Sequence, residues 1–159
     1  GDALIQLIMH KKDEYYKLAY VYLENQEDAL DALEDMIVII YEKLFWLRKN
    51  ESFDSWSKVI LVNCCKKILK SRKKLVHMAI LPETGHEGFI QNKENQLLVE
   101  EYLKTISPKQ QEAIRLKYLA DLDYETIAQI LKVPIGTVKS RISIGLKRMQ
   151  ELVGGDTDA

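Results

Sequence analysis

Hydrophobic residues in the first half of the chain recur with the period of an α-helix. A first helix is indicated by steps of three and four residues through Tyr15, Leu18, Ala19, Tyr22 and Leu23. A second helix, over about 28–44, is expected to turn inward Ala29, Ala32, Leu33, Met36, Ile37, Ile40, Tyr41 and Leu44. Asn25 is a suitable N-cap for this helix, because its side chain can accept from a first-turn amide.

A polar segment over 50–55 interrupts the periodicity and predicts a loop. Ser52 or Asp54 is expected to cap a third helix, over about 56–74. Its inward residues are predicted to be Trp56, Val59, Ile60, Asn63 and Ile68. Residues 76–95 lose helical periodicity and hold Pro82, Gly85 and Gly88, which is typical of a linker.

Helical order returns from Leu97, and Ser107-Pro108-Lys109-Gln110 is the sequence of a capping box. The segment 124–143 then fits a helix-turn-helix. Ala128 is the expected contact between its two helices, and their crossing is set by Ile127, Leu131, Val133 and Val138. The turn is predicted over 132–136, with Thr137 opening the second helix. Lys132 stands where such turns often use glycine, because the backbone there can need a positive φ.

These patterns predict an all-α protein with two small helical domains and no convincing β-strand. We place the domains at 1–75 and 96–153, joined by a flexible linker over 76–95 and followed by a tail over 154–159. At 159 residues the chain is long enough for two modest cores.

Composition excludes several classes of protein. The longest apolar run, Met36–Tyr41, is too short for a membrane span, and no signal peptide is recognised. The two cysteines, Cys64 and Cys65, are adjacent, which suits reduced cytosolic thiols better than a disulfide or a metal site. We find no Gly-rich phosphate loop, no metal-ligand cluster and no nucleophile beside a base, so neither an enzyme nor a cofactor is expected.

Charge is unevenly distributed in a chain whose net charge is only −1. Residues 24–35 hold six acids and no base, 55–82 hold seven Lys or Arg and no acid, and 126–150 hold five Lys or Arg and no acid. Two basic stretches suggest two nucleic-acid surfaces, and the acidic stretch suggests another partner. Each stretch by itself would also fit a solvated helix face.

Several motifs, in order, resemble the extracytoplasmic-function (ECF) sigma factors of bacterial RNA polymerase. The segments 106–112 and 134–142 resemble sigma region 4, and 16–20, 25–29 and 31–36 resemble region 2. Phe53-Asp54-Ser55-Trp56, then Val62-Asn63 and a basic helix end, resemble the promoter-melting segment. The likeness covers about 13–152.

The resemblance implies partners and site residues. The partners would be core RNA polymerase (β′ clamp helices and β flap), promoter DNA and an anti-sigma factor. Polymerase-binding residues would be Asp31, Glu34, Asp35, Ile39 and Glu42. The minus-35 element would be read by Thr137, Lys139, Ser140, Arg141 and Ser143, with Lys147 and Arg148 on phosphates. The minus-10 residues would be Asn50, Ser52, Phe53, Asn63, Lys66, Lys67, Lys70, Arg72, Lys73 and Lys74, with Lys58 a further phosphate contact.

Alternatives remain open from the residues alone. Phe53 and Trp56 also fit core positions, which for Trp56 is the favoured interpretation, and Asn63 also fits a buried hydrogen-bonding role. A stand-alone helix-turn-helix regulator would explain 97–152 but leaves the basic helix before the linker unexplained. A protein that acts only by binding other proteins is a third possible function. The near-neutral charge further predicts weak promoter binding by the free chain, since electrostatic affinity follows the phosphates neutralised.

Overall fold

The computed structural model describes residues 2–47, 52–78 and 93–157, and helices are the regular structure throughout these ranges. Side chains are described for 2–47, 52–73 and 98–154. The chain divides into two compact units, Gly1–Gly88 and Phe89–Ala159. The predicted all-α fold with two helical parts is therefore confirmed.

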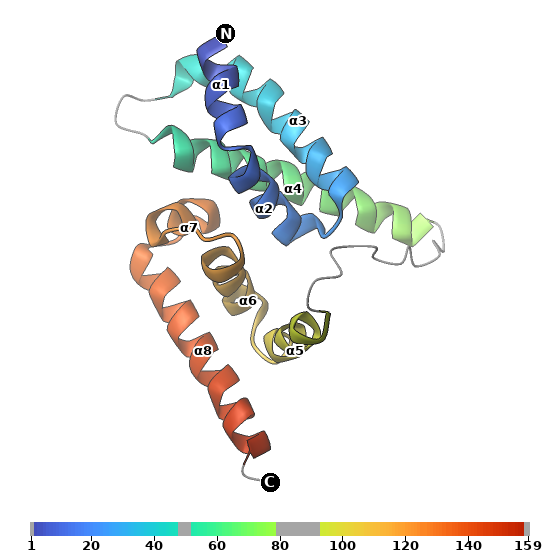
Figure 1. Ribbon diagram of the computed structural model, residues 1–159, viewed down its shortest axis with the longest axis vertical. Coiled ribbons are helices and arrows are strands. Elements are labelled where there is room, and N and C mark those ends of the chain that lie inside the picture. The colour runs from blue at the N-terminus through green and yellow to red at the C-terminus, as the bar shows by residue number, and fades with distance from the viewer. Residues whose placement is uncertain (1, 48–51, 79–92, 158–159) are drawn as a thin grey trace. The chain divides into compact units, whose positions relative to one another are not determined.

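The first unit contains α1 (Asp2–His10), α2 (Lys12–Leu23), α3 (Gln26–Lys43), the short 3₁₀ turn η1 (Leu44–Trp46) and α4 (Phe53–Met78). Helices α2, α3 and α4 pack against one another in pairs (Figure 1). The large side chains that are fully buried between them are Tyr15, Leu18, Leu23, Met36, Ile40, Leu61 and Val62.

Local sequence fixes the junction of α2 and α3. Glu24 adopts a left-handed conformation, φ 59°, and ends α2. Asn25 is extended, and its side-chain oxygen accepts from the Asp28 amide at 2.8 Å, which confirms the predicted N-cap. The connection is therefore a tight corner, and it lays α3 against α2.

The predicted inward faces of two helices are partly wrong. On α3, Ile37 and Tyr41 are exposed, the latter by 68%. On α4, Asn63 is exposed and Trp56 is only half-buried, whereas Leu61, Val62, Cys64 and Cys65 are buried. The inward face of α4 also includes small and polar residues, because α4 packs against both α2 and α3, and Ser57 and Lys58 have polar partners there.

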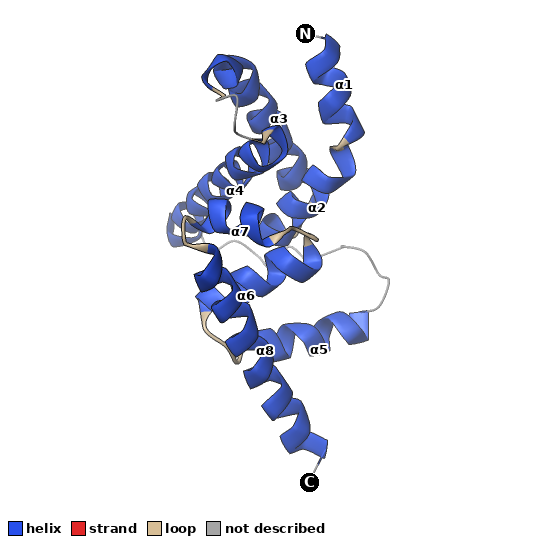
Figure 2. Cartoon of the chain, turned by 90° about the vertical axis from the view of Figure 1, so that its left-hand side faces the viewer, coloured by secondary structure: helices blue, strands red, loops and turns tan. Residues whose placement is uncertain are grey.

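The second unit contains α5 (Lys93–Leu103), α6 (Pro108–Ile114), the π-helical turn η2 (Arg115–Leu119), α7 (Tyr124–Leu131) and α8 (Ile135–Thr157). Helix α8 packs against α5, α6 and α7, and it is the long helix at the C-terminal end of the chain (Figure 2). The core of the second unit is built from Leu103, Ile106, Ala113, Ile114, Leu116, Ala120, Leu122, Ile127, Ile130, Val138 and Ile142.

Two polar features fix α6 and η2. The capping box is confirmed: the Gln110 amide donates to Ser107 Oγ and the Ser107 amide donates to Gln110 Oε1, both at 3.2 Å. Arg115 donates to both carboxylate oxygens of Glu100 on α5, at 2.6 and 2.8 Å. This pairing lowers the pKa of Glu100 and joins α5 to η2.

Some helix limits differ from the sequence prediction. Helix α4 continues past Lys74 to Met78, because no residue there interrupts it. Helix α8 begins at Ile135, two residues before Thr137, and continues through 154–157, which were predicted as tail. Much of the predicted linker, 79–92, lies outside the described residues. None of the described helices combines the length and apolarity that a membrane span requires.

Candidate nucleic-acid interfaces

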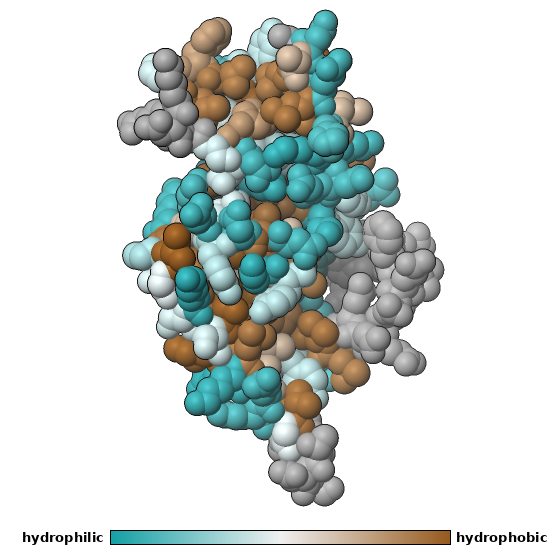
Figure 3. Space-filling view, turned by 60° about the vertical axis from the view of Figure 1, so that its left-hand side comes forward, coloured by the Kyte–Doolittle hydropathy of each residue, from teal (hydrophilic) through white to brown (hydrophobic). Residues whose placement is uncertain are grey.

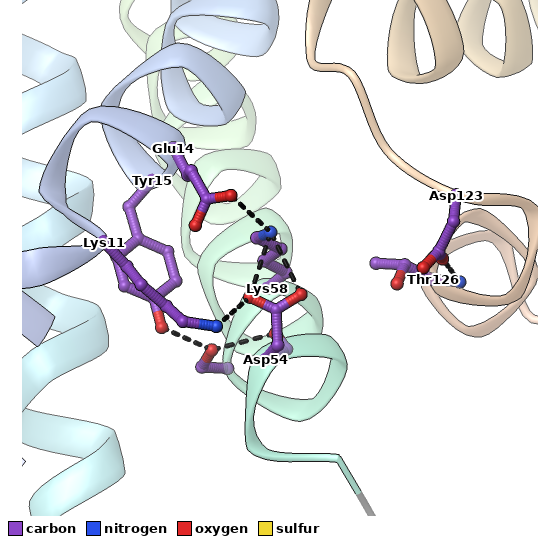
Figure 4. A network of polar contacts seen from close by, with 8 residues as sticks. Lys11, Glu14, Tyr15, Asp54, Lys58, Asp123 and Thr126 are labelled. Atoms are coloured by element: carbon purple, nitrogen blue, oxygen red, sulfur yellow. Dashed lines mark hydrogen bonds and ion pairs between the residues drawn. The ribbon is translucent and has the colours of Figure 1, made fainter. Parts of the chain in front are cut away.

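The predicted helix-turn-helix is formed by α7 and α8. Asp123 caps α7, because its Oδ1 accepts from the Thr126 amide at 2.7 Å (Figure 4). Ile127, Ala128 and Val138 are buried where the two helices meet. The packing of α7 against α8 therefore depends on the apolar positions that the sequence singled out.

The turn between these helices carries the backbone strain expected at Lys132. Its φ is 58° and its ψ 45°, the left-handed conformation that glycine adopts at lower cost. The Val133 amide donates to the Ala128 carbonyl at 3.1 Å, and the carbonyl of Pro134 accepts from the amides of Thr137 and Val138. The turn is thus closed by backbone hydrogen bonds on both sides.

The recognition helix α8 separates a packing face from an outer face. Val138, Ile142 and Gly145 are buried at steps of four and three residues. Ile142 therefore takes the packing role, as predicted, and Arg141 is half-buried beside it. The exposed predicted contacts are Lys139, Ser140, Ser143, Lys147 and Arg148, while Thr137 is half-buried. An outer face of hydroxyl and basic groups matches what a major groove presents.

One contact at the start of this motif was not evident from sequence. The Lys139 ammonium lies 5.4 Å from the centroid of the Tyr124 ring, and the Lys117 ammonium lies 4.4 Å from the same centroid. Cation–π attraction at this range gathers two positive charges on one ring. Lys117 was missed because it belongs to η2, and only folding brings it beside α8.

The basic residues of α4 form a face that points away from the core. Asn63, Lys66, Lys67, Lys70 and Lys73 are all exposed and recur at steps of three and four residues. The Lys66 ammonium lies 6.0 Å from the Tyr22 ring centroid, so it reaches toward α2. We name this set the lysine face.

Two predicted phosphate contacts have internal partners instead. Lys58 is buried against Asp54, which contradicts its prediction as a phosphate contact. Arg72 pairs with the Asp28 carboxylate and donates to the Leu23 carbonyl at 3.3 Å, which ties α4 to the α2–α3 corner. Asn50 lies outside the described residues, and so does the side chain of Lys74.

Aromatic residues occur in the first turn of α4 and in η1, which precedes it in the chain. Phe53 and Trp56 are half-buried and form a tilted pair with centroids 6.0 Å apart, so Trp56 is no core residue. Phe45 and Trp46 in η1 are exposed by 95% and 80% and were not considered from sequence. Hydrophobic side chains also gather at this end of the unit in Figure 3. Exposed aromatic rings of this kind commonly mark binding surfaces.

The outer face of α3 combines acids with apolar side chains. Asp31, Glu34, Asp35 and Glu42 are exposed, and Ile39 is half-buried. Alongside the acids lie the exposed side chains of Leu30, Ile37, Val38 and Tyr41. We name these four residues the apolar ridge; sequence reasoning missed the ridge because Ile37 and Tyr41 fitted the period of the buried face.

Both cysteines are free and buried in α4. Burial raises the pKa of the Cys65 thiol to about 12, and it raises the pKa of Cys64 as well. Both thiols therefore stay protonated near neutral pH, in keeping with structural rather than reactive side chains. No grouping of three potential metal ligands occurs within the described ranges.

Comparison with known proteins agrees with this geometry. Residues 96–149 match the family described as sigma-70, region 4. The chain is 29% identical over 150 residues to RNA polymerase sigma factor SigV of Bacillus subtilis, covering 92% of this chain and 89% of SigV. It is 31% identical over 130 residues to the ECF RNA polymerase sigma-E factor of Salmonella typhimurium, covering 72% and 68%.

Solved structures share the fold. The sigma factor RpoE from Bartonella quintana, crystallised with the anti-sigma factor NepR, aligns with a TM-score of 0.69 at 23% identity, covering 97% of this chain and 98% of that one. The helix-turn-helix and the matched family define a transcription factor of the sigma-70 class. Within that class, the chain belongs to the extracytoplasmic-function RNA polymerase sigma factors.

Proposed function

We propose that this sigma factor binds core RNA polymerase through α3 and places two DNA-reading surfaces on a promoter. The second unit would read the minus-35 element as duplex, and the first unit would hold the melted minus-10 strand. What carries the proposal is the presence in one chain of a helix-turn-helix in one unit and, in the other unit, of a separate lysine face on α4 together with exposed aromatic rings in η1. A stand-alone regulator would need only the first of these surfaces.

The polymerase contact is assigned to the outer face of α3. Its acids Asp31, Glu34, Asp35 and Glu42 lie alongside the apolar ridge, and Ile39 lies at the other edge of the acids. Buried apolar area supplies most of the affinity of an interface, while rim charges set its orientation and rate of association. We therefore assign the β′ clamp helices to this face, and the β flap to the second unit.

Minus-10 recognition is assigned to the start and the lysine face of α4. Ser52, Phe53 and Asn63 would contact extruded bases, and an exposed Asn amide can pair with a base edge. The four lysines of the lysine face would hold the strand's phosphates. Phe45 and Trp46 add rings on which unpaired bases stack, an interaction of about 1–3 kcal/mol per base. The favourable stacking would offset the cost of opening the duplex.

Minus-35 recognition is assigned to the first turns of α8. Lys139, Ser140 and Ser143 project from the exposed face, with Thr137 and Arg141 at its edges. Lys147 and Arg148 lie one to two turns further and would bind phosphates. Lys117 joins them through Tyr124, because its ammonium and that of Lys139 both lie over the Tyr124 ring. Phosphate contacts then set the orientation from which the early residues read bases.

The chain itself would catalyse no reaction, because the polymerase supplies the chemistry of transcription. Its place would be the cytoplasm, where polymerase and promoter meet. An anti-sigma factor is a further expected partner: the RpoE structure of the same fold was solved in complex with one. Such a partner would inhibit by covering the α3 or α4 surfaces.

Run-off transcription with core polymerase and genomic DNA tests the proposal. We expect specific transcripts that appear only when the full-length chain is added. Alignment of their start sites should reveal two shared elements at minus-35 and minus-10 spacing. Failure of the chain to bind core polymerase, or transcripts with no shared minus-10 element, would contradict the proposal and favour a regulator that acts through its helix-turn-helix alone.

A further inference from the structure

A polar network joins the α1–α2 junction to the first turn of α4. Lys11 lies between α1 and α2, and its ammonium donates to Asp54 Oδ1 at 2.6 Å. Lys58, one turn along α4, donates to the same carboxylate at 3.1 Å. Figure 4 shows both ammonium groups converging on Asp54. One carboxylate thus accepts from two cations on different elements.

A second pair of hydrogen bonds runs beside the first. Ser57 Oγ donates to the backbone carbonyl of Asp54 at 3.0 Å, so Ser57 accepts from the Tyr15 hydroxyl at 2.7 Å. Tyr15 and Ser57 are fully buried. Tyr15 of α2 therefore holds the backbone carbonyl of Asp54 through Ser57, while Lys11 holds the Asp54 side chain. We name Lys11, Tyr15, Asp54, Ser57 and Lys58 together the Asp54 network.

The buried Lys58 and the ionised Asp54 of this network depend on each other for charge balance. The Lys58 side chain is only 6% exposed, and its remaining acidic neighbour is Glu14, whose Oε1 lies 4.0 Å away. Burial alone would raise the pKa of Asp54, but the hydrogen bonds from Lys11 and Lys58 outweigh it and lower the pKa. Asp54 is therefore ionised at neutral pH, and its charge balances a lysine that burial would otherwise penalise.

The network lies next to the residues assigned to the minus-10 site. Ser52 and Phe53 directly precede Asp54, and the Ser52 carbonyl accepts from the Trp56 amide at 3.0 Å in the first turn of α4. Phe53 stacks near Trp56 in that same turn. The first turn of a helix lacks a full set of hydrogen bonds and frays unless it is held. Here side chains from the α1–α2 junction and α2 hold it.

We infer that Lys11 and Asp54 are positioning residues for minus-10 recognition, an inference that rests on the function proposed above. They touch no DNA themselves. They fix the first turn of α4, and with it the angle at which Ser52 and Phe53 meet an extruded base. Neither side chain belongs to the lysine face, so a change in them should alter base selection without altering phosphate contacts.

The test measures base selection rather than activity alone. Lys11→Met and Asp54→Asn are assayed as full-length proteins with core polymerase. The promoter is one found by run-off transcription, and each minus-10 base is substituted in turn. The readout is the ratio of transcription from the native promoter to that from its best substituted version. We expect this ratio to fall about tenfold in both variants, as when one well-placed base contact is lost.

Controls separate positioning from stability. Lys11→Arg keeps the cation and is expected to retain the ratio. Glu100→Gln breaks a comparable ion pair in the second unit and should leave the minus-10 ratio unchanged, whatever it costs in stability. Minus-35 selection should be intact in Lys11→Met. If Asp54→Asn fails to fold because Lys58 is left unpaired, Lys11→Met still decides, since Asp54 and Lys58 remain paired in it.

The outcomes distinguish the two hypotheses. A wild-type protein with no minus-10 preference overturns the proposed function. A wild-type protein that selects its minus-10 bases, together with a Lys11→Met variant that selects them equally well, overturns the positioning role alone. Loss of selection in Lys11→Met with restoration in Lys11→Arg supports it.

Discussion

A Cβ atom placed on Gly145 would lie 2.7 Å from Cδ1 of Ile114, so α8 and α6 meet at van der Waals contact. Gln110 Cβ and Ile106 Cδ1 would each lie 3.3 Å from that added Cβ atom of residue 145. Glycine at this position is therefore explained by the close approach of two helices, rather than by any unusual backbone angle.

Gly145→Ala should destabilise the second unit. Replacing an exposed helical glycine by alanine raises the free energy of unfolding by up to about 1 kcal/mol. At Gly145, however, the added methyl group must displace Ile114. Gly154→Ala is the matched control, because nothing lies within 4 Å of a Cβ there. Urea unfolding followed by circular dichroism should show Gly145→Ala less stable than Gly154→Ala; equal stabilisation of both would contradict the close contact.

Lys132→Gly should stabilise the helix-turn-helix. The left-handed φ of 58° is costly for a residue with a Cβ, and glycine relieves that cost. We expect the free energy of unfolding to rise by about 0.5–1 kcal/mol, the balance after the greater entropy of glycine in the unfolded chain. Gln129→Gly, within α7, should instead lower the free energy of unfolding by about 1 kcal/mol. A destabilising Lys132→Gly would mean that the lysine side chain itself stabilises the turn.

Arg141→Ala and Lys147→Ala should affect promoter binding differently. Loss of a base contact by Arg141 should cost about 1–3 kcal/mol and relax selection at one minus-35 position. Loss of a phosphate contact by Lys147 should weaken all sequences alike and reduce the salt dependence of binding by about one counterion. Holoenzyme binding to promoter variants at several salt concentrations separates the two. Identical behaviour of the two variants would contradict the division of roles along α8.

Tyr41→Ala should weaken binding to core polymerase without unfolding the protein. Tyr41 is largely exposed in the free chain, so its loss removes interface rather than core. We expect the dissociation constant to rise at least about tenfold, as for a buried aromatic anchor at an interface. Ile5→Ser, also an exposed apolar residue but on α1, serves as the control. Unchanged affinity of Tyr41→Ala would assign the polymerase contact to the acids alone.

Acid should abolish the contribution of Asp54 to stability. The pKa of Asp54 is lower in the folded protein than its ordinary value of 3.8, so its stabilisation is complete above that value. It is lost as the pH falls through the lowered pKa. Asp54→Asn should therefore be less stable than wild type at pH 7, and this difference should shrink as the pH falls below 3.8 and through the lowered pKa. Fluorescence of Trp46 and Trp56, both in the first unit, reports the unfolding.

Sequence alone determined the helical fold, the caps and the helix-turn-helix. Asn25, Ser107 and Lys132 act through hydrogen bonds and backbone angles within a few residues, so local pattern was sufficient to predict them. The ordered motifs of regions 2 and 4 likewise identified the family. Long-range packing was not needed for any of these.

Tertiary structure decided which faces are free. Periodicity places Tyr41 and Ile37 close to the buried face, but only the positions of α2 and α4 determine that they remain exposed. The same holds for Lys58, whose burial depends on Asp54 and Glu14, and for Lys117, which reaches Lys139 only through Tyr124. A periodic pattern gives the angle of a residue around its own helix. The partner of each residue depends on how separate helices pack, and that depends on contacts between residues far apart in the chain.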